Sequence, residues 1–83
     1  MDICLITFRS VTPAQRGENA LRREGISCAI HRTPKQLADQ GCGYSLRLRS
    51  DQLHQAVEVL RHRGIPYRKA YALRNGVPEE VIV

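Results

Sequence analysis

Hydrophobic residues recur along the chain with two different spacings, and each spacing predicts one kind of element. Residues 3–8 form a short apolar run with branched and aromatic side chains, which is typical of a buried strand. In residues 44–49, apolar side chains alternate with Ser45, Arg47 and Arg49, which predicts a strand with one buried and one wet face. The other apolar segments of strand length are residues 26–32 and 66–73.

Helical spacing predicts a first helix over residues 10–25. Thr12 suits its N-cap and Pro13 its first turn, because Pro lacks the N–H that is unpaired there anyway. Gly17 lies on the apolar face, where a glycine costs about 1 kcal/mol relative to Ala. We therefore expect a close approach of the backbone to a neighbouring element at this point. Gly25 is expected to end the helix in a left-handed conformation.

A second helix is predicted after Ser50, its expected N-cap, and ends at Gly64. An internal repeat supports both helices, since residues 21–27 resemble residues 60–66 where a helix turns into a strand. The apolar stripe of the second helix consists of Leu53, Ala56, Val57 and Leu60.

These elements follow the order βαββαβ and predict an α+β, ferredoxin-like domain over residues 1–73. Right-handed crossovers place both helices on one face of a four-stranded antiparallel sheet and leave the other face open. The connection over residues 33–43 is longer than a usual hairpin loop, and long loops often carry function. Residues 74–83, with an Asn75-Gly76 turn, are expected to be a C-terminal tail.

Composition narrows the class of protein. A chain of 83 residues with a net charge of +5 fits one small domain with an acidic partner or a solvated basic surface. The first residues do not resemble a signal peptide, and no apolar run is long enough to cross a bilayer, so we expect a soluble, cytoplasmic protein. Three widely spaced cysteines predict neither a disulfide framework nor a metal site, and no cofactor is indicated.

The tripeptide Gly41-Cys42-Gly43 is the most distinctive local feature. Two flanking glycines leave the thiol accessible and free the backbone angles around it. The same tripeptide is also typical of a tight turn that holds a passive thiol, and the two interpretations are evenly matched. The other two cysteines, Cys4 and Cys28, fall inside apolar strands and are expected to be buried and inert.

Basic residues flank the cysteine in sequence. Lys35 and Arg47 would favour its thiolate, and Arg32 and Arg49 are candidates for contact with a partner. Non-specific nucleic-acid binding by these arginines is a weaker alternative, because the predicted strands lack an aromatic platform for stacked bases.

Several short segments resemble the selenium/sulfur carrier-like proteins in their order and spacing. They are Leu5-Ile6-Thr7-Phe8-Arg9-Ser10, Leu21 to Ile26, Thr33-Pro34, Cys42-Gly43 and Gly64-Ile65. The resemblance implies that Cys42 accepts a sulfane sulfur or selenium atom as a persulfide or its selenium analogue. A cysteine desulfurase-type enzyme would be the donor and another protein the acceptor. Such a chain is a carrier rather than a complete enzyme.

Two considerations oppose or complicate this interpretation. Asp39 precedes Cys42 by three residues, and its negative charge would oppose thiolate formation. The competing hypothesis is a binding or regulatory module in which the cysteine is incidental.

The apolar tail at residues 81–83 makes a homodimer reasonable, because large exposed apolar areas are usually covered.

Overall fold

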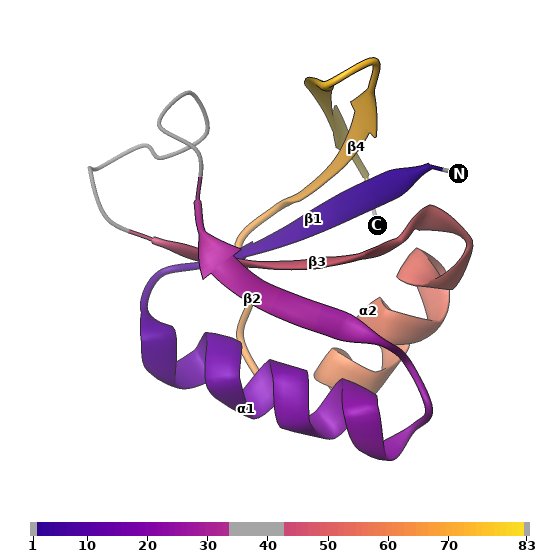
Figure 1. Ribbon diagram of the computed structural model, residues 1–83. Coiled ribbons are helices and arrows are strands. Elements are labelled where there is room, and N and C mark those ends of the chain that lie inside the picture. The colour runs from indigo at the N-terminus through magenta and orange to yellow at the C-terminus, as the bar shows by residue number, and fades with distance from the viewer. Residues whose placement is uncertain (1, 34–42, 83) are drawn as a thin grey trace.

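The computed structural model describes residues 2–33 and 43–82, which form an α+β domain with two helices and a five-stranded antiparallel sheet (Figure 1). In chain order the elements are β1 (Ile3–Phe8), α1 (Val11–Arg23), β2 (Cys28–Arg32), β3 (Tyr44–Arg49), the 3-10 helix η2 (Ser50–Gln52), α2 (Leu53–His62), β4 (Ala70–Arg74) and β5 (Val77–Val81).

The strands lie in the order β2-β3-β1-β4-β5, and every neighbouring pair is antiparallel. β1 lies at the centre, with Leu5 opposite Arg47 of β3 on one side and Tyr71 of β4 on the other. The first four strands and two helices follow the expected succession β-α-β-β-α-β. The prediction of four strands is wrong, because a fifth strand pairs with β4.

β5 arises within the segment that was expected to be a tail. Asn75 and Gly76 form the connecting turn with φ angles of 53° and 78°, the left-handed region that these two residue types tolerate best. Pro78 lies opposite Leu73, and most side chains of β5 are exposed or half-buried. The strand is therefore held mainly by backbone pairing with β4, and Val81 packs against the core. β4 is consequently an inner strand of the sheet.

β4 begins at Ala70 rather than at residue 66, and Thr7 gives the reason. The N–H of Thr7 donates to the carbonyl of Lys69 at 2.8 Å, while its own carbonyl accepts from Arg68 N–H at 2.7 Å. Two residues thus lie opposite one, which is the count of a β-bulge. The Thr7 hydroxyl also accepts a bond from Lys69 N–H at 3.1 Å, so this irregular pairing is fixed by a side chain.

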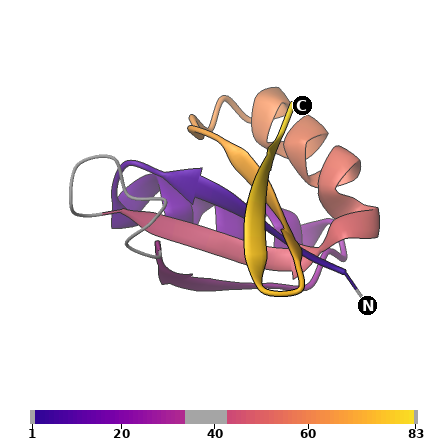
Figure 2. The same ribbon diagram turned by 90° about the horizontal axis from the view of Figure 1, so that it is seen from above.

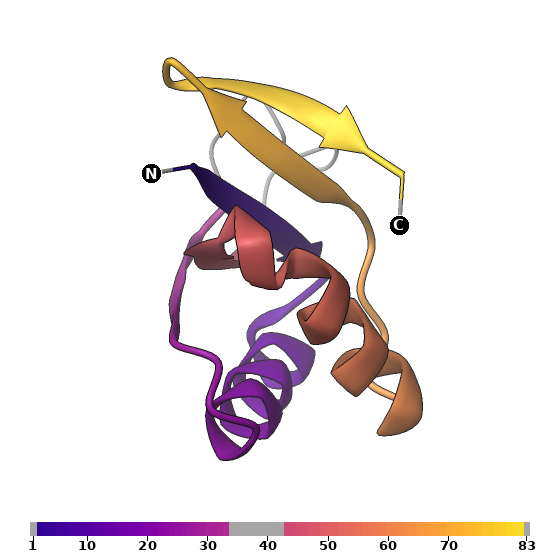
Figure 3. The same ribbon diagram turned by 90° about the vertical axis from the view of Figure 1, so that its right-hand side faces the viewer.

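Both helices pack on the same face of the sheet (Figures 1 and 3). A Cβ atom at Gly17 of α1 would lie 3.2 Å from side-chain carbons of Phe8, Leu46 and Leu60. This confirms that the helix backbone approaches its neighbours closely at the glycine. The largest fully buried side chains are Phe8, Ile6, Leu21, Ile26, Leu46, Leu60, Cys4 and Ser45.

The two helices end in the same way. Ile26 N–H donates to the Leu21 carbonyl and Ile65 N–H to the Leu60 carbonyl, both at 2.9 Å. Gly25 and Gly64 between them have φ angles of 78° and 65°. This is the bonding of a Schellman-type C-terminus, and it confirms the internal repeat seen in the sequence.

The helix starts differ from the prediction. α1 takes Ser10 as its N-cap, so Thr12 already lies inside the first turn. Ser50 begins η2 instead of capping α2, whose N-cap is Gln52. β2 likewise starts at Cys28, two residues later than expected.

The second face of the sheet lies away from the helices, and the β4–β5 hairpin rises on that side (Figures 1 and 2). This face was expected to be open, yet several of its side chains are buried, including Leu5, Thr7, Ser45 and Tyr71. Neither α1 nor α2 is long and apolar enough to cross a bilayer.

Candidate functional site

Cys4 and Cys28 belong to the hydrophobic core, as predicted. Burial raises the pKa of the Cys4 thiol from 9.0 to about 11, and the negative charge of Asp51 acts in the same direction. Burial also raises the pKa of Cys28, with a further contribution from Glu18. Both thiols are therefore protonated at neutral pH and poor nucleophiles.

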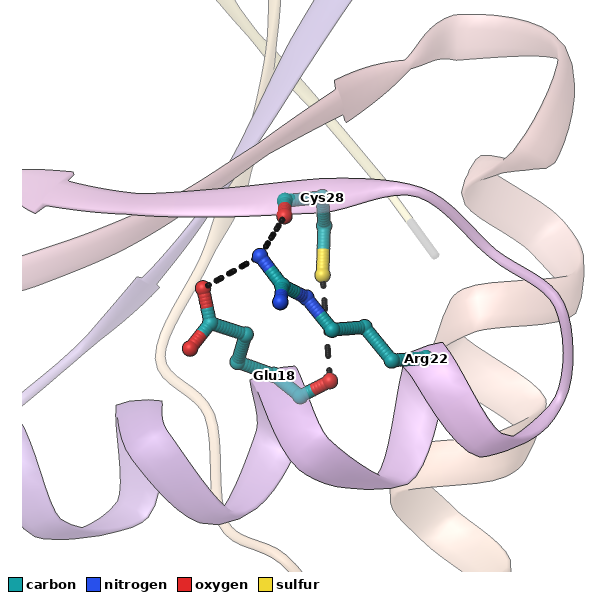
Figure 4. A network of polar contacts seen from close by, with 3 residues as sticks. All are labelled: Glu18, Arg22 and Cys28. Atoms are coloured by element: carbon teal, nitrogen blue, oxygen red, sulfur yellow. Dashed lines mark hydrogen bonds and ion pairs between the residues drawn. The ribbon is translucent and has the colours of Figure 1, made fainter.

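A small polar network holds Cys28 against α1 (Figure 4). Its Sγ donates to the backbone carbonyl of Glu18 at 3.9 Å. Arg22 donates to the carbonyl of Cys28 at 3.3 Å and to the carboxylate of Glu18 at 3.4 Å. Arg22 opposes the rise in the pKa of the thiol, but burial remains the larger effect. The thiol of Cys28 thus serves to join β2 to α1.

The two ends of the long connection meet in a defined way. Thr33 N–H donates to the carbonyl of Gly43 at 2.9 Å, which continues the β2–β3 pairing by one step beyond the strands. Cys42 is bonded directly to Gly43. Three of the predicted site residues, Lys35, Gly41 and Cys42, lie outside the described residues.

Gly43 has a packing role that the sequence did not indicate. A Cβ atom at this position would lie 3.1 Å from the carbonyl oxygen of Phe8 and 3.2 Å from the hydroxyl of Thr33. Its φ angle is not in the left-handed region. The glycine is therefore needed for the close approach of β1 and Thr33, whether or not it also gives access to the cysteine.

Arg32 and Arg47, two of the predicted basic residues, line one groove on the sheet face away from the helices. The groove has a volume of about 270 Å³. We call it the open-face groove; its described lining residues are Leu5, His31, Arg32, Ser45, Arg47, Leu73, Gly76 and Pro78. Arg49, the third predicted arginine, does not line the groove and instead forms an ion pair with Asp51 at 2.7 Å.

Ser45, the second residue of β3, has a buried hydroxyl group. Its side chain is fully buried, and its hydroxyl lies 2.9 Å from that of Thr33. The alternation in β3 predicted a serine on the wet face, and no sequence signal indicated that its hydroxyl would be buried and paired. The contribution of Gly76 and Pro78 to the groove was missed for another reason, because residues 74–83 were expected to be a tail.

The described surface lacks the features of two other site classes. No group of three or more His, Cys, Asp or Glu side chains that could hold a metal ion occurs in residues 2–33 or 43–82. Tyr71 is buried and Tyr67 packs against the core, so neither of these tyrosines offers an exposed platform for a stacked base.

The fold and these side chains define a small α+β domain with two inert core thiols, Cys4 and Cys28. The chain matches the family described as "Putative Se/S carrier protein-like" over residues 3–72, and it belongs to that family. The matched range includes Cys42 and Gly43 as well as the groove residues of β1, β2 and β3. Comparison with curated proteins gives no match.

Proposed function

We propose that the protein carries a sulfane sulfur or selenium atom on Cys42 and passes it from a donor enzyme to an acceptor protein. The family match over residues 3–72 is the observation that carries this proposal. The thiols elsewhere in the chain support it by elimination. Cys4 and Cys28 are buried with raised pKa values, which leaves Cys42 as the candidate among the three cysteines.

The loading step is a thiol–persulfide exchange without net oxidation. The Cys42 thiolate attacks the terminal sulfur of the donor persulfide, forming a new S–S bond. The S–S bond of the donor breaks, and the donor cysteine leaves as a thiolate. The terminal sulfur keeps its proton or loses it to solvent, so that Cys42 ends as a persulfide. Delivery to the acceptor repeats the same exchange in the opposite sense, and a selenium atom would follow the same course.

Two cationic side chains, one on β2 and one on β3, support this chemistry. Arg32 and Arg47 are exposed on the strands whose ends flank the cysteine-bearing connection. Positive charge stabilises a thiolate or a persulfide anion and would also attract an acidic surface on a donor or acceptor protein.

The direct test is loading by a cysteine desulfurase with cysteine as the sulfur source. Intact-mass measurement is expected to show the gain of one sulfur atom, and peptide mapping to place it on Cys42. Selenocysteine in place of cysteine compares the two elements in the same assay.

Two variants make the loading test specific. Cys42→Ser should abolish the adduct, while Cys28→Ser, which alters a thiol of the core, should leave it intact. Failure of the wild-type protein to load under conditions that load an established carrier would exclude the proposal. The module would then be one in which the cysteine is incidental.

A further inference from the structure

A second groove lies on the helix side of the molecule, between α1 and the chain that follows α2. Its floor consists of Ala20 and Ile65, which are buried, and its rim carries exposed polar side chains. We call it the helix-side groove; its described lining residues are Arg16, Asn19, Ala20, Arg23, Arg63 and Ile65. The volume is about 260 Å³, so side chains of a partner can enter the groove but a whole helix cannot.

Arginine supplies all the charge among the described lining residues of this groove. Arg16 and Arg23 form no ion pair within the part of the chain that the structure describes. Arg63 pairs with Glu24 at 3.5 Å, and both side chains of that pair are exposed. Arg47 on the other side of the sheet lacks an acidic partner too. The helix-side groove differs because three arginines line it together and no described acidic residue does.

The other flank of α1 shows an arginine whose charge is compensated. There Arg22 donates to the carboxylate of Glu18 at 3.4 Å and to the carbonyl of Cys28 at 3.3 Å (Figure 4). Arg23 follows in the last turn of α1, where positive charge also stabilises the helix dipole. Arg16 lies in the middle of α1, so the dipole does not account for it. Its charge is available to a partner.

The spacing of the two unpaired arginines matches that of acidic residues on another helix. Arg16 and Arg23 are seven residues apart on α1, which places them on one side of the helix and about 10 Å apart along its axis. Carboxylates at positions i and i+7 of a second helix have the same separation. A guanidinium binds a carboxylate through two parallel hydrogen bonds. The amide of Asn19, between the two arginines in sequence, is a further donor.

Charge and shape disfavour other occupants. In a two-fold dimer through this groove the same arginines would face each other and repel. A small acid would stay largely in water because most of the lining residues are exposed, whereas ligand pockets enclose roughly 70–90% of the ligand. No aromatic side chain is among the described lining residues, so the bases of a nucleic acid would have no platform for stacking.

We propose that the helix-side groove docks an acidic helix of a partner protein, whose carboxylates pair with Arg16 and Arg23. This goes beyond the proposed function, because the groove contains no thiol and sulfur transfer does not enter the argument. The net charge of +5 would accelerate association with an acidic partner, and added salt would slow it.

Peptide binding tests the proposal directly. The probe is an alanine-based helical peptide with glutamates at positions i, i+3 and i+7, and the control peptide has the same composition with the glutamates spread around the helix. Titration at low salt, followed by backbone amide NMR shifts, should show saturable changes at Asn19, Ala20 and Ile65. The control peptide should bind at least about 3-fold more weakly. Equal binding of both peptides, or of neither, would overturn the proposal.

Matched substitutions locate the site. The double variant Arg16→Gln, Arg23→Gln should weaken binding of the probe peptide about 10-fold, because each exposed ion pair changes affinity roughly 3-fold. Arg47→Gln removes a positive charge that is likewise unpaired among the described residues, but on the other side of the sheet. It should weaken binding less than about 2-fold. Equal losses per charge removed at both places would show that only net charge matters and would overturn the proposal.

Two further probes distinguish an acidic helix from other anions. A tetranucleotide of thymidine carries three phosphodiester charges, as many as the probe peptide has glutamates, and it should bind more weakly than the peptide. Tighter binding of the tetranucleotide would assign the groove to a nucleic-acid backbone and overturn the proposal. Sodium sulfate should displace the peptide no better than sodium chloride at equal ionic strength. Stronger displacement by sulfate would reveal a simple anion site, which also overturns the proposal.

Discussion

The two faces of the sheet carry different kinds of side chain, although the same strands supply both. On the helix-covered face, β3 contributes Leu46, which is fully buried beneath α1 and α2. On the other face its neighbours are Ser45, a buried hydroxyl, and Arg47, an exposed cation without an ion-pair partner among the described residues. The alternation of the strand thus places apolar core side chains on one face and polar and charged side chains on the other.

Sulfur chemistry follows the same division. Cys4 points into the helix-covered core, and its burial raises the pKa of the thiol to about 11. Cys28 lies at the edge of that core with a raised pKa as well. Burial in the helix-covered core thus makes both of these thiols poor nucleophiles.

Among the changes that test this difference between the two faces, Leu46→Ala should have the largest effect on stability. Removing a fully buried Leu leaves a cavity beneath both helices and should lower the free energy of unfolding by about 2–5 kcal/mol. Urea denaturation followed by circular dichroism measures the loss. Arg47→Ala, one position along the same strand, is the matched control and should change it by less than about 0.5 kcal/mol. Equal losses in both variants would contradict the assignment of stability to one face.

Alkylation of the native protein gives the next largest contrast. A thiol with a pKa of about 11 instead of 9.0 holds about 100-fold less thiolate at neutral pH, so Cys4 should react with iodoacetamide at least that much more slowly than a free thiol. Peptide mapping at successive times measures each site separately. Cys28 should also be protected, and the proposed function requires Cys42 to react first. Fast labelling of Cys4 in the folded protein would show that the core does not shield it.

The same raised pKa values give stability a defined pH dependence. The folded protein binds the thiol proton of Cys4 more tightly than the unfolded chain does, so this contribution is complete below pH 9 and is lost as the pH rises towards 11. Cys28 acts in the same direction. The measurement that isolates the thiol is the difference in unfolding free energy between the wild type and Cys4→Ala, which should shrink from pH 8 to pH 11.

Gly43→Ala should have a smaller effect on stability, and it tests the packing of Gly43 against Phe8 and Thr33. The added methyl group would meet a backbone oxygen of Phe8 at 3.1 Å, and such overpacking typically costs about 1–3 kcal/mol. Thr33→Ala in the same chain removes the second close contact, at 3.2 Å, and should recover only part of the loss. A double-mutant cycle of unfolding free energies measures this coupling. Complete recovery would mean that the Phe8 carbonyl moves freely and that β1 does not fix the position.

Much of the fold follows from the sequence because it rests on buried apolar periodicity. Gly17 predicted a close approach, and the approach is to Leu46, Leu60 and Phe8. The Leu-x-x-x-Gly-Ile repeat predicted two similar helix ends, and both have the same bond of 2.9 Å. These features are local, or they depend on which side chains avoid water, and both kinds of information are present in a single sequence.

The parts that were missed depend on backbone pairing between distant segments. None of the side chains of β5 is fully buried, so the strand is defined mainly by its ladder with β4. The bulge at Thr7 delays β4 through bonds to residues 68 and 69, more than 60 residues away. The open-face groove was missed for the same reason, since three of its eight described lining residues come from that hairpin. Of the predicted site, the structure brings together Arg32 and Arg47, while Arg49 lies apart.

Arg49→Ala should have the smallest effect on stability, and it tests the sheet face away from the helices. Its ion pair with Asp51 is short, at 2.7 Å, but both side chains are at least half exposed. Exposed pairs contribute about 0–1 kcal/mol, and salt screens them. Thermal unfolding of Arg49→Ala and Asp51→Ala at low and at high salt should therefore show small losses that vanish at high salt. A larger loss that persists in salt would mean that the face away from the helices also stabilises the fold, and the division between the two faces would fail.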